Sequence, residues 1–267
     1  MPKFTAAVLL LLCSVCHFKV SAQSSYNDEI RKASTAFIQS LSPLQKRAAL
    51  ISFDDTARVH WNNLPVGLRA RVGISIGDMT EAQRKLLHRI LSVSLSSQGY
   101  LKATGIMHLD NLLNMFVDTT YYRKDINDTL RQFLTDLKWT HRNYYLAFFG
   151  TPADKNWGYK VEGHHLSVNY TFSGDKLSVT PWFIGTDPAE MQITQYAGWR
   201  VLGQEEDLGL QLIHMLTPAQ QKKATMSRDV PGDIITGAET GKRIIDYWGI
   251  KGSELTNEQK AVLQYII

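Results

Sequence analysis

The chain has 267 residues, of which 44% are hydrophobic, and its 29 basic and 25 acidic side chains leave a net charge of +4. Charges of both signs are interspersed along the chain, which argues against a protein that binds nucleic acid or a membrane surface. The length is enough for one large hydrophobic core or two small ones.

The N-terminus has the pattern of a secretory signal peptide. Residues 1–3 are a short basic start, residues 4–16 are an apolar run too short to span a membrane, and small residues at 20–22 precede Gln23. We therefore expect a leader at residues 1–22 and a secreted or periplasmic mature chain that begins at Gln23 and has no membrane span. An uncleaved anchor is the alternative.

Both cysteines, Cys13 and Cys16, lie in this leader. The mature chain therefore has no disulfide, no thiolate metal site and no cysteine nucleophile, so histidine and carboxylate side chains are the available metal ligands. The leader also contains Lys3 and Lys19 and no acidic residue. Its removal takes two of the 29 basic residues and leaves 27 against 25 acidic ones, a net charge of +2.

Four segments begin with the same capping sequence, in which a serine or threonine is followed three residues later by glutamine. They begin at Ser42, Thr80, Thr217 and Thr256. Their spacing is not one period, so we interpret them as four similar helix starts rather than as a repeat array. Apolar residues at three- and four-residue spacing complete the helix predictions. The predicted helices are residues 34–41, 44–53, 79–100, 101–116, 128–139, 208–216, 219–227 and 256–267.

The strand signal is strongest in the middle of the chain. Residues 144–149 form an aromatic strand-like run, and residues 161–172 alternate between apolar and polar side chains as a single strand. A turn at 173–176 and a return strand at 177–183 complete a β-hairpin with one dry face and one polar face. These elements predict an α+β fold with one domain over residues 23–267, in which helices pack around a small antiparallel sheet with this hairpin at its centre.

The last predicted helix ends on the apolar residues Ile266 and Ile267, without the glycine or basic residue that usually closes a helix. We therefore expect that the domain is truncated at its C-terminal end.

Several sequence blocks resemble the domain-of-unknown-function family numbered 3500. The blocks are Trp157-Gly158, residues 162–169 with the sequence Glu-Gly-His-His-Leu-Ser-Val-Asn, Thr180-Pro181, Gly185-x-x-Pro188-Ala189-Glu190 and Gly198-x-Arg200-x-Leu202. The resemblance covers nearly all of the mature chain, and the Glu-Gly-His-His block is its most specific part. The family has no established activity, so the resemblance implies no mechanism. It also implies a further C-terminal segment that this chain lacks, and any site shared with that segment would be incomplete here.

The first candidate site is the cluster of Glu162, His164 and His165. Neighbouring residues of a strand point to opposite faces, so we expect Glu162 and His164 to share the face of Leu166, while His165 lies on the other face. A bulge at Gly163 would turn one imidazole toward the other. The two histidines would then bind a divalent metal ion, zinc or iron.

This cluster predicts a metal-dependent hydrolase in which Glu162 acts as a base or the metal activates water. The alternative is that His164 is a hydrogen-bonded core residue and His165 a surface residue.

The second candidate site is a ligand-binding surface. Ser167 and Asn169 lie on the polar face of the predicted hairpin, and Trp157 and Trp182 lie close to it in sequence. Exposed aromatic side chains often line clefts for sugars or other ring compounds, which predicts a non-catalytic extracellular module for a small molecule or glycan. The more ordinary interpretation is that the polar face is solvated and the aromatic residues belong to the core. The sequence leaves the substrate and the oligomeric state open.

Overall fold

The computed structural model describes residues 22–118, 127–230 and 246–267, together with residues 232, 234, 236, 237 and 244. The predicted leader lies outside the described residues except for Ala22, at which the first helix begins.

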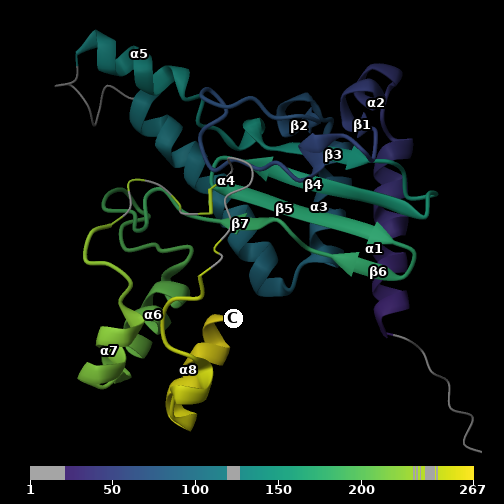
Figure 1. Ribbon diagram of the computed structural model, residues 1–267. Helices are drawn as coiled ribbons and strands as arrows, with labels where there is room; N and C mark the ends of the chain where they lie inside the picture. Colours follow the sequence, from purple (N-terminus) through teal and green to yellow (C-terminus); the bar gives the residue numbers. More distant parts are fainter. Residues whose placement is uncertain are drawn as a thin grey trace, which may run out of the picture.

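The described residues form an α+β fold with helices around a mixed sheet of seven strands (Figure 1). The sheet order is β1-β3-β4-β5-β6, with β2 paired to β3 and β7 paired to β5. All pairs are antiparallel except β1 with β3, which is parallel, so the predicted purely antiparallel sheet is corrected at this edge. The strands are β1 Leu50–Ile51, β2 Ile74–Ser75, β3 Tyr145–Phe149, β4 Asn156–Gly163, β5 Leu166–Ser173, β6 Lys176–Ser178 and β7 Trp182–Ile184.

The predicted helices are present, with shifted ends. The helices are α1 Ala22–Gln39, α2 Pro43–Ala49, α3 Glu81–Ser94, α4 Ser97–Asp118, α5 Asp128–Asp136, α6 Gly203–Met215, α7 Pro218–Ala224 and α8 Asn257–Ile266. None of the described helices has the length and apolarity needed to cross a membrane.

The prediction of one continuous strand over residues 161–172 is wrong. The chain reverses at His164 and His165, and Gly163 pairs with Leu166 across the reversal. His165, the second residue of this turn, has a φ of 54°, which lies in the left-handed region of backbone conformations. Polar and apolar side chains alternate both before and after the turn, so the sequence pattern resembled that of a single strand.

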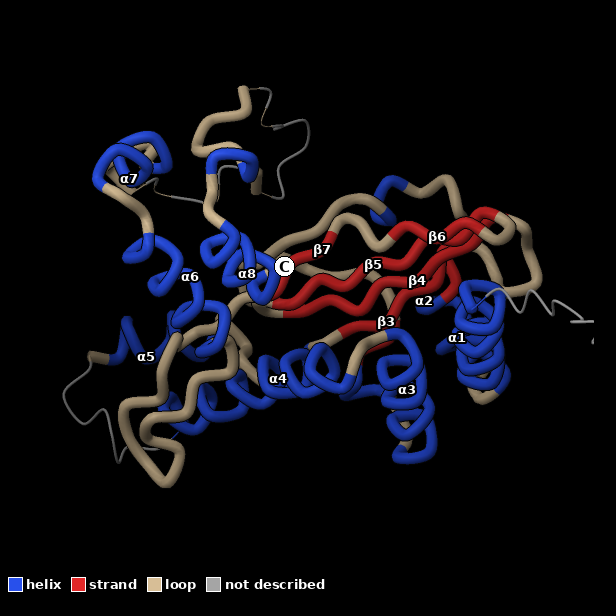
Figure 2. The backbone as a smooth tube through the Cα atoms, turned by 90° about the horizontal axis from the view of Figure 1, so that it is seen from below, coloured by secondary structure: helices blue, strands red, loops and turns tan. Residues whose placement is uncertain are grey.

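One face of the sheet packs against α1, α3 and α4, which Figure 2 shows together on the same side of the strands. Trp157 stacks on Phe172 with ring centroids 4.4 Å apart, and Tyr159 stacks on Tyr170 at 5.0 Å. Tyr159 donates to the hydroxyl of Ser94, and Tyr170 donates to the carbonyl oxygen of the same residue at the end of α3. The polar tips of these buried rings therefore fix α3 to the sheet.

The other face of the sheet is covered by the connection between β1 and β2, residues 52–73 (Figure 1). Lys160 in β4 donates from its ammonium group to the carbonyl oxygens of Ala57 and His60, each at 2.9 Å. The backbone N–H of His165 donates to the carbonyl oxygen of Asn63. Polar side chains of the sheet therefore form hydrogen bonds with backbone groups of residues 52–73. These bonds allow the irregular segment to cover the polar face of the sheet, which is buried rather than solvated as predicted.

The four predicted capping boxes are confirmed, and the structure groups them into two equivalent pairs. The side-chain amide of Gln45 exchanges hydrogen bonds with that of Gln83, 38 residues later. Gln220 and Gln259, 39 residues apart, do the same between α7 and α8. Gln83 also donates to the carbonyl oxygen of Ser40 after α1, and Gln259 to that of Met215 at the end of α6, so the arrangement of α1, α2 and α3 resembles that of α6, α7 and α8. Within the described residues, α1 and α3 share the core of the sheet.

Candidate functional site

The turn between β4 and β5 brings two imidazole rings together. The ring centroids of His164 and His165 lie 4.1 Å apart, with an angle of 48° between their planes. The bulge predicted at Gly163 is not needed to bring the rings together. The two histidines lie in a turn, where the alternation of side chains along a strand does not separate them. Gly163 has a separate reason to be glycine, since a Cβ there would lie 2.4 Å from Cδ1 of Tyr144.

His164 is buried and held by a carboxylate from α4. Its Nδ1 lies 2.7 Å from Oδ1 of Asp110, which is itself 3% exposed. The hydroxyl of Tyr144 donates to the carbonyl oxygen of His164 at 2.7 Å. Burial raises the pKa of Asp110, and the hydrogen bond from the imidazole opposes this rise. Because Nδ1 is used by Asp110, Nε2 is the nitrogen of His164 that remains for a ligand.

His165 is partly buried and has a ring nitrogen without a hydrogen bond. Its Nδ1 is inaccessible to solvent and has no partner among the described residues. Loss of solvation and the neighbouring His164 lower the pKa of His165 to about 4, so its ring is neutral at pH 7. A Cβ at Gly185 would lie 2.9 Å from this Nδ1, so the absence of a side chain there makes room for the ring.

An exposed carboxylate completes the cluster. One ligand atom each from His164, His165 and Asp187 lies within 4.8 Å of the other two. Two imidazoles and a carboxylate form a ligand set that binds zinc or iron(II) and leaves coordination positions open. A carboxylate that holds the second nitrogen of a ligating histidine is the usual support of such a site, and Asp110 occupies that position.

Sequence reasoning missed Asp110 and Asp187. Asp110 lies 54 residues before His164 in the middle of a helix, and no local pattern distinguishes it there. Asp187 lies inside the Gly185-x-x-Pro188 block that carried the family resemblance, so this block was a usable signal.

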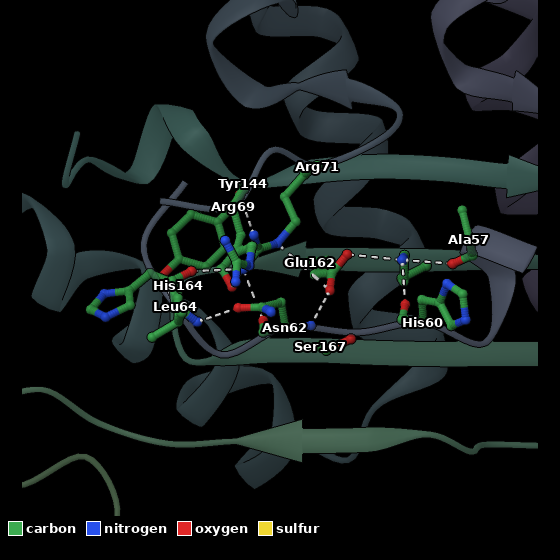
Figure 3. A network of polar contacts seen from close by, with 12 residues as sticks. Ala57, His60, Asn62, Leu64, Arg69, Arg71, Tyr144, Glu162, His164 and Ser167 are labelled. Carbon is green, nitrogen blue, oxygen red and sulfur yellow. Dashed lines mark hydrogen bonds and ion pairs between the residues drawn. The ribbon is translucent and has the colours of Figure 1, made fainter. Parts of the chain in front are cut away.

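Glu162 lies outside this cluster, on the polar face of the sheet. Its Oε2 lies 2.9 Å from Nζ of Lys160, and its Oε1 accepts the backbone N–H of Asn62 at 2.8 Å and lies 3.6 Å from Nε of Arg71. Figure 3 shows the ring of His164 directed away from this carboxylate. The prediction that Glu162 shares the face of Leu166 is wrong, because the turn reverses the chain before Leu166 and pairs Glu162 with Ser167.

The predicted ligand-binding residues are mostly buried. Trp157 and Ser167 have no solvent exposure and Asn169 is 2% exposed, so none of the three presents a surface to a ligand. Asn169 instead donates to the hydroxyl of Ser167 and to the carbonyl oxygen of Pro181. Trp182 is 40% exposed and remains accessible.

Comparison with known proteins identifies one family. The family described as "Protein of unknown function (DUF3500)" matches residues 23–267, which is nearly the whole chain. No curated protein and no solved structure matches the chain.

Proposed function

The chain belongs to the DUF3500 family, and because the function of that family is unknown we propose one from the geometry: His164, His165 and Asp187 bind a divalent metal ion, zinc or iron, in a metal-assisted hydrolase. The observation that carries this proposal is the proximity of three ligand atoms, one from each residue, within 4.8 Å of one another.

Three further features support the proposal. Asp110 holds His164 in the orientation that leaves Nε2 for the metal. His165 has a buried nitrogen without a hydrogen bond, and a buried polar atom of this kind costs free energy unless it has a partner. Its lowered pKa keeps the ring neutral and able to ligate far below pH 7.

The chemistry follows from the ligand set. A metal ion held by three protein side chains keeps a position for water and lowers the pKa of that water to about 7, which supplies a nucleophile at neutral pH. The chain's own contribution is to orient the ligands: Asp110 fixes His164, and the exposed Asp187 leaves one side open to a substrate. Glu162 is not the base in this proposal, because Lys160 and Asn62 already bind its carboxylate.

Calorimetric titration of metal-free protein with Zn²⁺ and Fe²⁺ tests the proposal. We expect one ion per chain, no measurable binding by Asp187→Asn, and a loss of about 10–100-fold in affinity for Asp110→Asn. Asp175→Asn, a change at an exposed aspartate, is the matched control and keeps wild-type affinity. Absence of stoichiometric binding, or wild-type affinity in Asp187→Asn, contradicts the metal site. Metal-dependent cleavage within a panel of esters, amides and phosphoesters then tests the hydrolase.

We also propose that the protein is exported with residues 1–22 as a cleaved leader. The basic, apolar and small-residue segments of the N-terminus support this, and the family match begins at residue 23. N-terminal sequencing of protein recovered outside the cytoplasm is expected to begin at Gln23, and a chain that begins at Met1 contradicts the proposal.

A further inference from the structure

A second site lies beside the metal cluster, between the polar face of the sheet and the connection that covers it. A cavity of ≈ 420 Å³ is lined there by residues of both parts, including Trp61, Arg69, Arg71, Lys160 and Glu162. Figure 3 shows Arg69, Arg71 and Glu162 of this lining. Its volume falls within the range of sites for small molecules. None of the three candidate metal ligands lines it.

The wall of this cavity contains an excess of buried positive charge. The side chains of Arg71, Lys160 and Glu162 are each at most 4% exposed, so two cations face one carboxylate. A buried charge without a counter-charge is strongly unfavourable, and a third charged group of negative sign would balance the set. Loss of solvation lowers the pKa of Arg71, in agreement with incomplete compensation by Glu162.

The hydrogen-bond donors of Lys160 and Arg71 are largely occupied by groups of the protein itself. Lys160 donates to two backbone carbonyls and to Glu162, which uses all three of its donors. Arg71 donates from Nη2 to the carbonyl oxygens of Asn62, Leu64 and Gly163, and from Nη1 to that of Arg69. Its buried Nε has no hydrogen-bond partner and lies 3.6 Å from Oε1 of Glu162. Arg71 therefore uses most of its donors within the protein, so it contributes positive charge to the cavity rather than free hydrogen-bond donors.

The rim of the cavity adds a second arginine and an aromatic wall. Arg69 is exposed, and within the described part of the chain its guanidinium donates one hydrogen bond, to the carbonyl oxygen of Leu68. Trp61 stacks on Phe183 with ring centroids 4.7 Å apart, and Phe183 stacks on His165 at 6.3 Å. An arginine fork beside an aromatic ring suits a planar carboxylate with an apolar body.

We propose that this cavity binds a small organic carboxylate, whose single negative charge balances Arg71 and Lys160 against Glu162 and is held at the rim by Arg69. The site does not depend on the metal, because its walls contain none of the metal ligands. It borders the metal cluster through the rings of Trp61 and Phe183, so a bound carboxylate lies next to the proposed reaction centre.

The test uses benzoate as the probe, with full-length mature protein that has been stripped of metal and then dialysed free of chelator. Benzoate is expected to bind once per chain, measured by calorimetry. Benzamide, which has the same shape without the charge, is expected to bind at least about tenfold more weakly, as is benzoate to Arg69→Gln. Arg47→Gln changes an exposed arginine of α2 that does not line the cavity and keeps wild-type affinity.

Three results would overturn the proposal. They are the absence of saturable benzoate binding to the wild type, equal affinity for benzamide, and saturable binding of inorganic phosphate without binding of benzoate. Asp187→Asn is expected to bind benzoate with wild-type affinity. The carboxylate site and the metal site are therefore tested independently of each other.

Discussion

Replacement of Glu162 by glutamine separates a structural role for this residue from the catalytic role that its place in the Glu-Gly-His-His block suggests. The substitution removes the charge and preserves the shape, and it leaves Lys160 and Arg71 buried without a counter-ion. The three side chains are at most 4% exposed, and Lys160 lies 2.9 Å from the carboxylate. Loss of one partner from a buried ion pair costs about 3–5 kcal/mol, so we expect Glu162→Gln to lower the free energy of unfolding by that amount.

Urea denaturation followed by circular dichroism measures this loss. Glu29 is the matched control, because it also pairs with one lysine and one arginine, Lys32 and Arg89, but on the surface. Glu29→Gln is expected to change stability far less, since solvent screens exposed pairs. A loss below about 1 kcal/mol for Glu162→Gln, the size measured for exposed pairs, would contradict a buried ion-pair role for Glu162. If Glu162→Gln instead lost zinc affinity and kept its stability, Glu162 would be a residue of the metal site.

Four further substitutions test other parts of the structure. Gly163→Ala places a Cβ 2.4 Å from the ring of Tyr144 and should lower stability by about 1–3 kcal/mol or more, and an unchanged thermal midpoint would contradict the close contact. Gln83→Ala and Gln259→Ala each remove a buried amide from equivalent networks, so calorimetric scans should show similar losses of about 2–4 kcal/mol, and a loss in only one of them would argue against equivalent units. Gly185→Ala should weaken zinc binding at least roughly tenfold, because the added methyl would displace the neighbouring imidazole, and wild-type zinc affinity would exclude that imidazole as a ligand.

Local signals in the sequence predicted the helices well. Each of the four capping boxes involves residues three positions apart, and each is present in the structure, for example between Ser42 and Gln45. The pairing of Gln45 with Gln83 could not be predicted in the same way, because it depends on two helix starts meeting in space. The repeat of this pairing between α7 and α8 likewise emerged only from the fold.

The hairpin turn carried a signal that strand alternation alone did not use. Inward-facing residues are odd-numbered before the turn, as at Tyr159 and Val161, and even-numbered after it, as at Leu166 and Val168. A two-residue turn produces this switch from odd to even numbers, whereas in one continuous strand the inward-facing residues would stay odd-numbered. Treating the segment as one strand placed Glu162 on the wrong face.

The candidate site was only partly predictable. His164 and His165 were named from the sequence, but their approach depends on the turn, and two carboxylates come from distant segments. Asp110 is a buried acid in the middle of α4, where its environment and not its sequence context makes it a partner for an imidazole. The site therefore rests on tertiary contacts that no short motif contains.

X-ray absorption spectroscopy of the protein loaded with one equivalent of Zn²⁺ tests the metal centre most directly. We expect a zinc ion bound by two imidazoles and at least one oxygen ligand, and the loss of one imidazole from the spectrum in His165→Ala. A spectrum without imidazole ligands, or one that is unchanged in His165→Ala, would contradict it.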